Sequence, residues 1–185
     1  MMTRITDLNG KIAALEVELE AELAKRRAEL CVGLEHGRIV FENELARRHR
    51  ELRKSLLPYV IRANPLIVLT APLIYSLVLP LLLLDLFITA YQVVCFPIYK
   101  IEKIRRSDYL VFDRYHLSYL NLLEKLNCAY CSYANGVIAY AREIAGRTEQ
   151  YWCPIKHARR VISAHSQYAN FLDYGDASAY RDLIR

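Results

Sequence analysis

Two pairs of residues in the C-terminal half of the chain have the side chains and the spacing of metal ligands. Cys128 and Cys131 form a C-x2-C pair, and after 21 further residues Cys153 and His157 form a C-x3-H pair. Thiolates and imidazole hold tetrahedral Zn²⁺, and structural zinc sites commonly combine two closely spaced pairs. Because residues three or four apart share one face of a helix, each pair can point at one ion. The sequence therefore predicts a Cys3His metal site, with zinc as the first choice and an iron–sulfur cluster as the second.

Other interpretations of the same cysteines stay open. A C-x2-C pair can be redox-active, and free cysteine is also one of the most often buried side chains, so these thiols can be packing residues. The short glycine-rich loops of zinc knuckles are missing here, and aromatic residues flank the cysteines instead: Tyr130, Tyr133, Tyr151 and Trp152. With Cys31 and Cys95 the total is five, and in a reducing compartment we expect no disulfides from this odd set.

No catalytic residues are predicted. Glu143, Glu149, His116 and His165 form no Glu-x-x-His pair of the di-iron type, and a solvated helix face explains them. The sequence also has no nucleophile elbow, no phosphate-binding glycine loop and no dinucleotide fingerprint. These features favour a protein that is not an enzyme.

The elements that must position the Cys/His set are helices within residues 100–185. An apolar and aromatic face recurs at helical spacing before the first pair. Asn135-Gly136 is expected to interrupt this helix before the second pair. Pro154 suits the first turn of another helix, which would place His157 one turn above Cys153. The sequence thus predicts a small helical Cys/His domain.

An apolar segment, residues 58–99, precedes this domain. Pro65 to Leu84 has no charge and is about 20 residues long, which is the length that crosses roughly 30 Å of hydrocarbon as a helix. Asp85 separates it from a shorter apolar stretch, Leu86 to Tyr99, and basic residues lie at both ends of the segment. Since positive charge favours the cytoplasmic side at both ends, we predict a hairpin, made of two short spans or re-entrant. Its turn would place Asp85 in the opposite headgroup layer, where the carboxylate needs no partner.

Two other placements of the apolar segment are considered. One is a single span followed by an interfacial helix, and the other is a hairpin buried inside a soluble protein. The first forty residues are highly charged and carry no secretory signal peptide pattern. The favoured hairpin therefore predicts a membrane protein with both termini in the cytoplasm.

Residues 1–57 are predicted to form one long, coiled-coil-like helix. Apolar residues follow alternating three- and four-residue steps, which place a narrow seam along one face. The seam consists of Ile5, Leu8, Ile12, Leu15 and Leu19. Gly33 and Gly37 each weaken the helical pattern by about 1 kcal/mol relative to Ala. The seam predicts self-association or a protein partner, with packing against the C-terminal domain as the alternative.

The composition unites these regions into an all-α protein with three parts, residues 1–57, 58–99 and 100–185. The net charge of +5 comes from 25 basic and 20 acidic residues. Basic residues crowd against the apolar segment, which indicates membrane-surface charge and no specific nucleic-acid binding. We expect a membrane-anchored scaffold or assembly subunit with a metal-stabilised cytoplasmic domain. The alternative is a metal- or redox-active membrane protein for metal handling, sensing or electron transfer.

Overall fold

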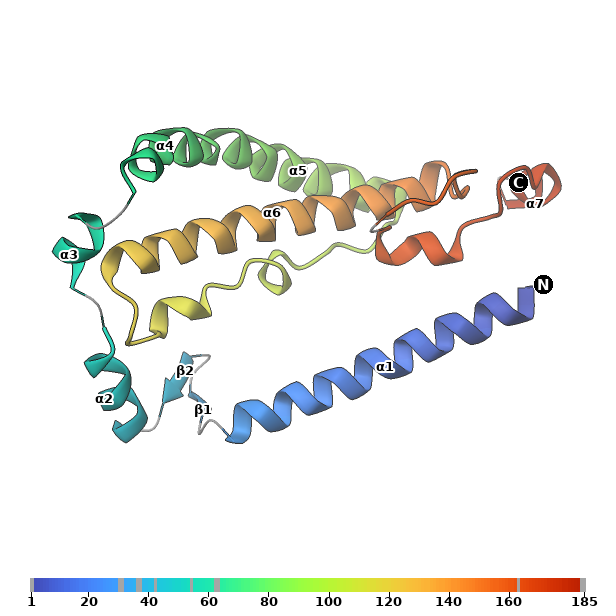
Figure 1. Ribbon diagram of the computed structural model, residues 1–185. Coiled ribbons are helices and arrows are strands. Elements are labelled where there is room, and N and C mark those ends of the chain that lie inside the picture. The colour runs from blue at the N-terminus through green and yellow to red at the C-terminus, as the bar shows by residue number, and fades with distance from the viewer. Residues whose placement is uncertain are drawn as a thin grey trace. The chain divides into compact units, whose positions relative to one another are not determined.

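The chain is mostly helical, as predicted. The computed structural model describes residues 2–29, 32–35, 38–41, 43–53, 55–61, 64–162 and 164–183 (Figure 1). The chain divides into two compact units. We call residues 1–63 with 113–128 the arm unit, and residues 64–112 with 129–185 the core unit. The predicted three-part division follows composition, whereas these units follow packing.

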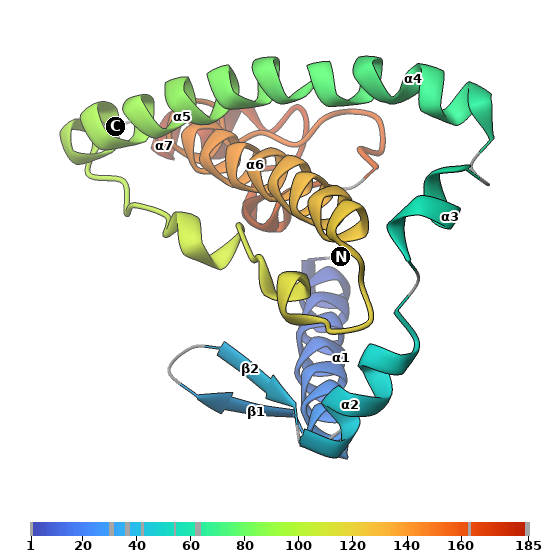
Figure 2. The ribbon, with the colours of Figure 1, turned by 90° about the vertical axis from the view of Figure 1, so that its left-hand side faces the viewer.

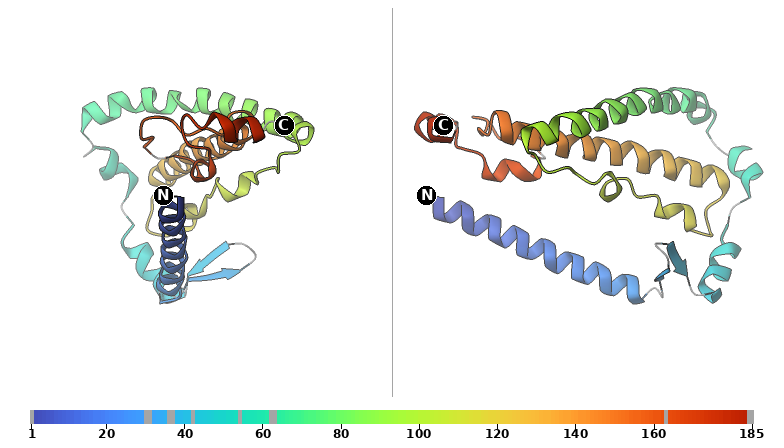
Figure 3. Two further views of the ribbon diagram at one scale, coloured as in Figure 1. Left: turned by 90° about the vertical axis from the view of Figure 1, so that its right-hand side faces the viewer. Right: turned by 180° about the vertical axis from the view of Figure 1, so that it is seen from behind.

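The arm unit opens with α1 (Met2–Glu29), a helix of 28 residues that Figure 3 shows as uninterrupted. An antiparallel hairpin follows, in which Val32 pairs with Phe41 and Glu35 pairs with Arg38. The strands of this hairpin are β1 (Val32–Glu35) and β2 (Arg38–Phe41). The unit also contains α2 (Asn43–Glu51), α3 (Leu56–Ile61), the 3-10 turn η2 (Asp113–His116) and the first turns of the long helix α6 (Leu122–Trp152).

The prediction of one helix over residues 1–57 is correct through Glu29 and wrong beyond it. Gly33 is a poor helix residue, and the β-branched and aromatic side chains of Arg38–Phe41 favour a strand over a helix. Cys31, Gly37 and the side chain of Ile5 lie outside the described residues.

The apolar segment forms α4 (Pro65–Ser76) and α5 (Val78–Tyr99), which together make one helical stretch of 35 residues. Asn64 caps its start, because the side-chain oxygen accepts a hydrogen bond from the backbone N–H of Leu66 at 2.9 Å. The most apolar window of this stretch has a mean hydropathy of 2.4. In length and composition this helix is suited to cross a membrane.

The hairpin turn predicted at Asp85 is wrong, because α5 continues through that residue without a break. The only discontinuity lies at Leu77, and even there the backbone stays right-handed, with φ −64° and ψ −13°. Pro80 explains its position, since proline has no N–H to donate to the carbonyl of Ser76. The prolines of this segment therefore modulate one helix and do not fold it back.

The chain reverses after α5. Lys100 adopts a left-handed backbone with φ 58°, and the N–H of Ile101 donates to the carbonyl of Phe96 at 2.9 Å, which closes the helix in a Schellman-type cap. The following segment, residues 101–112, has no helix or strand apart from the 3-10 turn η1 (Arg106–Asp108). It returns along α5, where Ile104 binds Gln92 and Arg106 binds Asp85.

α6 (Leu122–Trp152) is a helix of 31 residues. A capping box starts it: the backbone N–H of Glu124 donates to the Asn121 side chain at 3.0 Å, and the N–H of Asn121 donates to the Glu124 carboxylate at 2.8 Å. α6 lies beside α5 in Figures 1 and 2, with both helices running in the same direction. Tyr130 contacts the end of α4, and Tyr151 stacks on Tyr99 at the other end.

The predicted interruption at Asn135-Gly136 is wrong, because α6 continues through both residues. Gly136 is buried, and a Cβ there would lie 2.7 Å from the carbonyl oxygen of Tyr109. The glycine therefore lets the returning segment approach α6 closely, and this packing offsets its low helix propensity.

The predicted helix starting at Pro154 is also wrong. Ile155 instead forms a parallel bridge with Leu172, and the N–H of Leu172 donates to the carbonyl of Pro154 at 2.8 Å. The 3-10 turn η3 (Ser166–Asn170) and the short helix α7 (Ala177–Leu183) complete the core unit.

The hydrophobic core of this unit is shared by α5, the returning segment and α6. Its buried members are Phe96, Ile104, Leu110, Val137, Tyr140 and Ile144. Phe96 on α5 is fully buried, so the C-terminal half of the apolar helix is part of a protein core.

Candidate functional site

The structure does not bring the two predicted ligand pairs together. Cys131 lies on α6 and Cys153 directly follows its last turn. A continuous helix rises 1.5 Å per residue, so the 22 steps between these cysteines span about 33 Å. Among the residues that the structure describes, no group of three or more His, Cys, Asp or Glu side chains is placed to hold a metal ion.

Each member of the predicted Cys/His set has its own environment. Cys128 is half-buried and Cys131 is exposed on α6, while Cys153 is exposed at the end of that helix. The ring of His157 stacks on Tyr168 with centroids 6.2 Å apart, and the His157 backbone N–H donates to the Tyr168 hydroxyl at 2.7 Å. These four thiol and imidazole groups stay candidates for ligands, but α6 as it stands prevents them from sharing one ion.

A charged cluster forms around Asp85. Arg106 donates to its carboxylate twice, from Nη2 at 2.6 Å and from Nε at 3.1 Å. The Tyr133 hydroxyl donates to Oδ2 at 3.1 Å, and the Thr89 hydroxyl donates to Oδ1 at 3.4 Å. The bidentate geometry is the strongest form of an arginine–carboxylate pair. This cluster therefore joins α5, the returning segment and α6 at one point.

The expectation that Asp85 needs no partner is wrong, since its side chain is only 13% exposed and is paired with Arg106. The hydrogen bonds to Asp85 raise the pKa of the Arg106 guanidinium, and burial together with the bond to Asp85 raises the pKa of the Tyr133 hydroxyl. The pair remains charged, and it neutralises the single acidic residue of the apolar helix.

Gln92 is a functional position that sequence reasoning missed. Its side chain is buried on α5, where it donates to the Tyr140 hydroxyl at 2.8 Å and to the Ile104 carbonyl at 3.2 Å. Its carbonyl oxygen accepts from the Ile104 N–H at 2.7 Å. The available signal was composition, because Gln92 is the one side-chain amide between Pro65 and Tyr99. A buried amide with all these bonds fixes the returning segment against α5.

An aromatic cluster lies where α5 and α6 end. Tyr99 stacks on Tyr151 with centroids 5.2 Å apart, and Trp152 meets Tyr99 edge-on at 5.5 Å. Tyr151 and Trp152 are 50% and 58% exposed. Beside them Lys100 is exposed, so large amphipathic rings and a basic side chain gather at this end of the helix pair.

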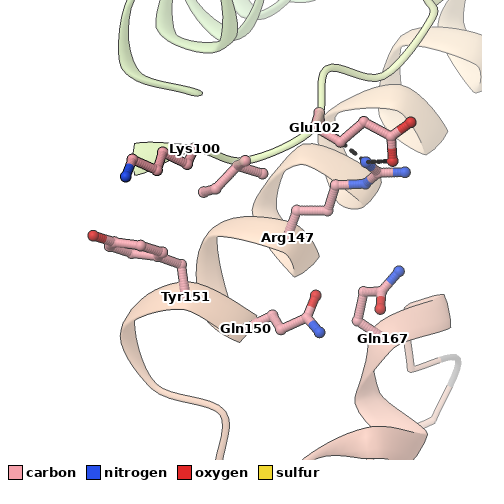
Figure 4. A pocket seen from close by; sticks show the side chains of 7 residues that line it. Lys100, Glu102, Arg147, Gln150, Tyr151 and Gln167 are labelled. Atoms are coloured by element: carbon pink, nitrogen blue, oxygen red, sulfur yellow. Dashed lines mark hydrogen bonds and ion pairs between the residues drawn. The ribbon is translucent and has the colours of Figure 1, made fainter. Parts of the chain in front are cut away.

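An open pocket of about 440 Å³ lies next to this cluster. Figure 4 shows Arg147 inside it, bound to the carbonyl oxygen of Glu102 at 2.8 Å and to its carboxylate at 3.3 Å. Arg147 also faces Glu143 at 3.5 Å. The carboxylates therefore offset the arginine charge, and Lys100 is the other basic side chain of the pocket lining.

The interpretation of Glu143, Glu149 and His165 as a solvated face is wrong. His165 lies 2.9 Å from the Glu149 carboxylate, and the Ser166 hydroxyl donates to Glu143 at 2.9 Å. A Cβ at Gly146 would lie 2.5 Å from the His165 ring. These contacts attach the segment before η3 to α6, which is a structural role.

The largest exposed apolar surface of the core unit lies along α4 and α5. The helical stretch is fully described, and it leaves sixteen large apolar side chains exposed. They are Leu66, Ile67, Val68, Leu69, Leu73, Ile74, Leu77, Leu79, Leu82, Leu83, Leu84, Leu86, Phe87, Val93, Val94 and Ile98. We call these residues the outer face. Contiguous exposed apolar surface of this kind is a common feature of interaction surfaces.

Comparisons with protein-family models, with curated proteins and with solved structures find no match to this chain. The candidate site therefore consists of the outer face, the Asp85 cluster behind it and the aromatic cluster at its end.

Proposed function

We propose that this protein is a membrane-associated scaffold or assembly subunit that attaches to the bilayer through α4 and α5. The outer face carries this proposal. Fully burying one large apolar side chain is worth about 1.5–3 kcal/mol, so sixteen side chains left in water are strongly unfavourable. Lipid removes this surface from water without requiring a partner for each side chain.

The second part of the proposal concerns α1. Leu8, Ile12, Leu15 and Leu19 are 50%, 55%, 63% and 59% exposed, so the described residues of the arm unit leave the predicted seam uncovered. Its three- and four-residue steps suit pairing with another helix. We propose that α1 pairs with a second copy of the chain, so that attachment and assembly use separate helices. Metal binding by the Cys/His set is not required for either role.

Vesicle flotation of the full-length protein tests the attachment. Phe87 and Val94 are seven residues apart on the outer face and 69% and 60% exposed, so changing both to Glu should leave the core intact. We expect Phe87→Glu/Val94→Glu to lower partition into phosphatidylcholine vesicles by at least about tenfold, because two apolar contacts are replaced by charges.

A matched control comes from α1. Leu8 and Leu15 have the same spacing and similar exposure, and Leu8→Glu/Leu15→Glu should float like the unchanged protein. The same pair should abolish the cross-linked dimer that we expect the unchanged protein to form. An unchanged protein that stays monodisperse without detergent and does not float would overturn the attachment.

A further inference from the structure

We infer that α4 and α5 lie in the plane of the membrane, with the outer face in the headgroup–acyl boundary of one leaflet and the rest of the core unit in water. This inference rests on the proposed membrane attachment and specifies its geometry. It places the two ends of the apolar helix, Asn64 and Lys100, on the same side of the bilayer.

The length of the helix gives the first argument. A helix of 35 residues is about 52 Å long, whereas the hydrocarbon is roughly 30 Å thick. A straight span that kept the whole stretch in hydrocarbon would tilt by roughly 55°, beyond the range of about 0–40° that membrane helices adopt. An in-plane helix has no such limit on its length.

The neighbours of the helix give the second argument, because they accompany it along most of its length. The Tyr130 hydroxyl donates to the carbonyl of Ile74 at 2.8 Å, near the end of α4. The Tyr91 and Thr148 hydroxyls are 3.1 Å apart, and Tyr151 stacks on Tyr99. A helix that crossed the bilayer would therefore carry α6 and the returning segment into the hydrocarbon with it.

Those neighbours are charged and exposed. Arg105 and Asp108 form an ion pair with side chains 84% and 52% exposed, and the Glu102 side chain is 88% exposed. They belong to the segment that Gln92 and the Asp85 cluster hold against α5. Charges that face lipid at this depth are costly, and these would have no water. In the in-plane arrangement the same side chains stay in water.

The two sides of α5 differ in a way that is compatible with the in-plane arrangement. On α5 the side chains that pack on the protein recur at three- and four-residue steps: Leu81, Asp85, Ile88, Gln92, Phe96 and Tyr99. On α5 the outer-face residues lie between these positions on the other side, whereas on α4 residues 66–70 are exposed all round the helix. Along α5 the boundary between protein and apolar surface thus runs parallel to the helix axis. A spanning helix packed on the same neighbours would have the same boundary, so the exposed charges of the returning segment decide between the two arrangements.

The aromatic cluster at the C-terminal ends of α5 and α6 is suited to the depth of the lipid headgroups. Tyr99, Tyr151 and Trp152 cluster beside Lys100, and aromatic and basic side chains concentrate at the level of lipid headgroups.

Depth measurement in vesicles tests this inference on the full-length chain. Leu69, Leu83 and Val94 lie on the outer face, 76%, 56% and 60% exposed, and each is changed to Cys in a chain whose native cysteines are Ser. A fluorescent label at each position is then quenched by lipids with spin labels at known depths. We expect three equal, shallow depths, and a label at Asp108→Cys that only a water-soluble quencher reaches.

A deep label at Leu83 with shallow labels at Leu69 and Val94, or a lipid-quenched label at Asp108, would overturn the in-plane arrangement and establish a span. If the unchanged protein does not float at all, the proposed function fails instead, so the two failures are distinct. Epitope tags at the two termini of the chain with its native cysteines provide a second readout. Protease should remove both tags from the same side of sealed vesicles, and removal of one tag alone would overturn the inference.

Discussion

At the scale of single residues, the apolar helix depends on how its few polar side chains are paired. Asp85 is 13% exposed, and three donors from α5, the returning segment and α6 converge on it. A carboxylate with so little water is tolerated because the guanidinium of Arg106 neutralises it in a bidentate geometry. Gln92 is buried without carrying a charge. Its amide is satisfied by the Tyr140 hydroxyl and by the backbone N–H and carbonyl of Ile104.

Removing Arg106 should therefore destabilise the core unit. Arg106→Ala leaves the Asp85 charge without its counter-ion, and since the Arg106 side chain is 46% exposed we expect a loss of about 1–2 kcal/mol in the free energy of unfolding. Arg105→Ala is the control, because that side chain is 84% exposed and should change stability by less than about 0.5 kcal/mol. Urea unfolding in detergent micelles measures both, and equal effects would contradict a special role for Arg106.

How far the site could be predicted depends on whether its signals are local. The apolar stretch from Pro65 is visible in sequence because length and hydropathy are local properties. The partner of Asp85 is not visible, since Arg106 is 21 residues away and Lys100, Lys103 and Arg105 compete for the role. The convergence of two Cys/His pairs likewise depends on whether the chain between them folds back.

The predicted Cys3His site can be tested with single cysteine substitutions. If Cys131 and Cys153 shared one ion, Cys131→Ser and Cys153→Ser would each remove the whole metal content. Because continuous α6 separates these thiols by about 33 Å, we expect the two substitutions to act independently on any zinc bound. Elemental analysis of the purified variants decides this. Complete loss of a stoichiometric ion in both variants would mean that α6 breaks between the pairs.

At the scale of elements, α6 shows why local sequence signals misplace a helix end. Asn135-Gly136 is a typical break signal, yet the helix continues because the backbone of the returning segment packs directly on Gly136. The same kind of signal at Gly33 coincides with a real end, since the arm unit has a strand there. The difference is a tertiary contact that sequence alone does not reveal. Helix existence was therefore predictable, while the position of its ends was not.

Substitution of two of the helical glycines, Gly136 and Gly10, should have opposite effects. In Gly136→Ala the new Cβ would lie 2.7 Å from the Tyr109 carbonyl and 3.2 Å from the Leu110 Cα, so backbone must move, at a cost of about 1–3 kcal/mol. In Gly10→Ala on α1 nothing lies within 4 Å, and the change should stabilise that helix by up to about 1 kcal/mol. Thermal unfolding followed by circular dichroism measures both variants. A neutral Gly136→Ala would contradict the close approach.

At the scale of the whole molecule, the apolar segment is not a separable anchor. Its outer face has no cover within the core unit, while its inner face supplies Phe96 and Gln92 to the core. Composition separates residues 58–99 from 100–185, because composition does not show that one side of the apolar helix packs in the core while the other side is exposed. Packing joins them, and the same helix that meets lipid in our proposal also holds the C-terminal residues in place.

This arrangement predicts that the C-terminal region needs the apolar helix to fold. A fragment of residues 100–185 lacks Phe96, whose side chain is 0% exposed in the intact core. It also lacks the amide of Gln92, which binds both backbone groups of Ile104. We expect this fragment to show no cooperative thermal transition and rapid proteolysis. A fragment of residues 64–185, kept in detergent, should melt cooperatively and resist protease. If residues 100–185 alone melted with the same midpoint as the longer fragment, the shared core would be dispensable, and the apolar helix would be a simple anchor after all.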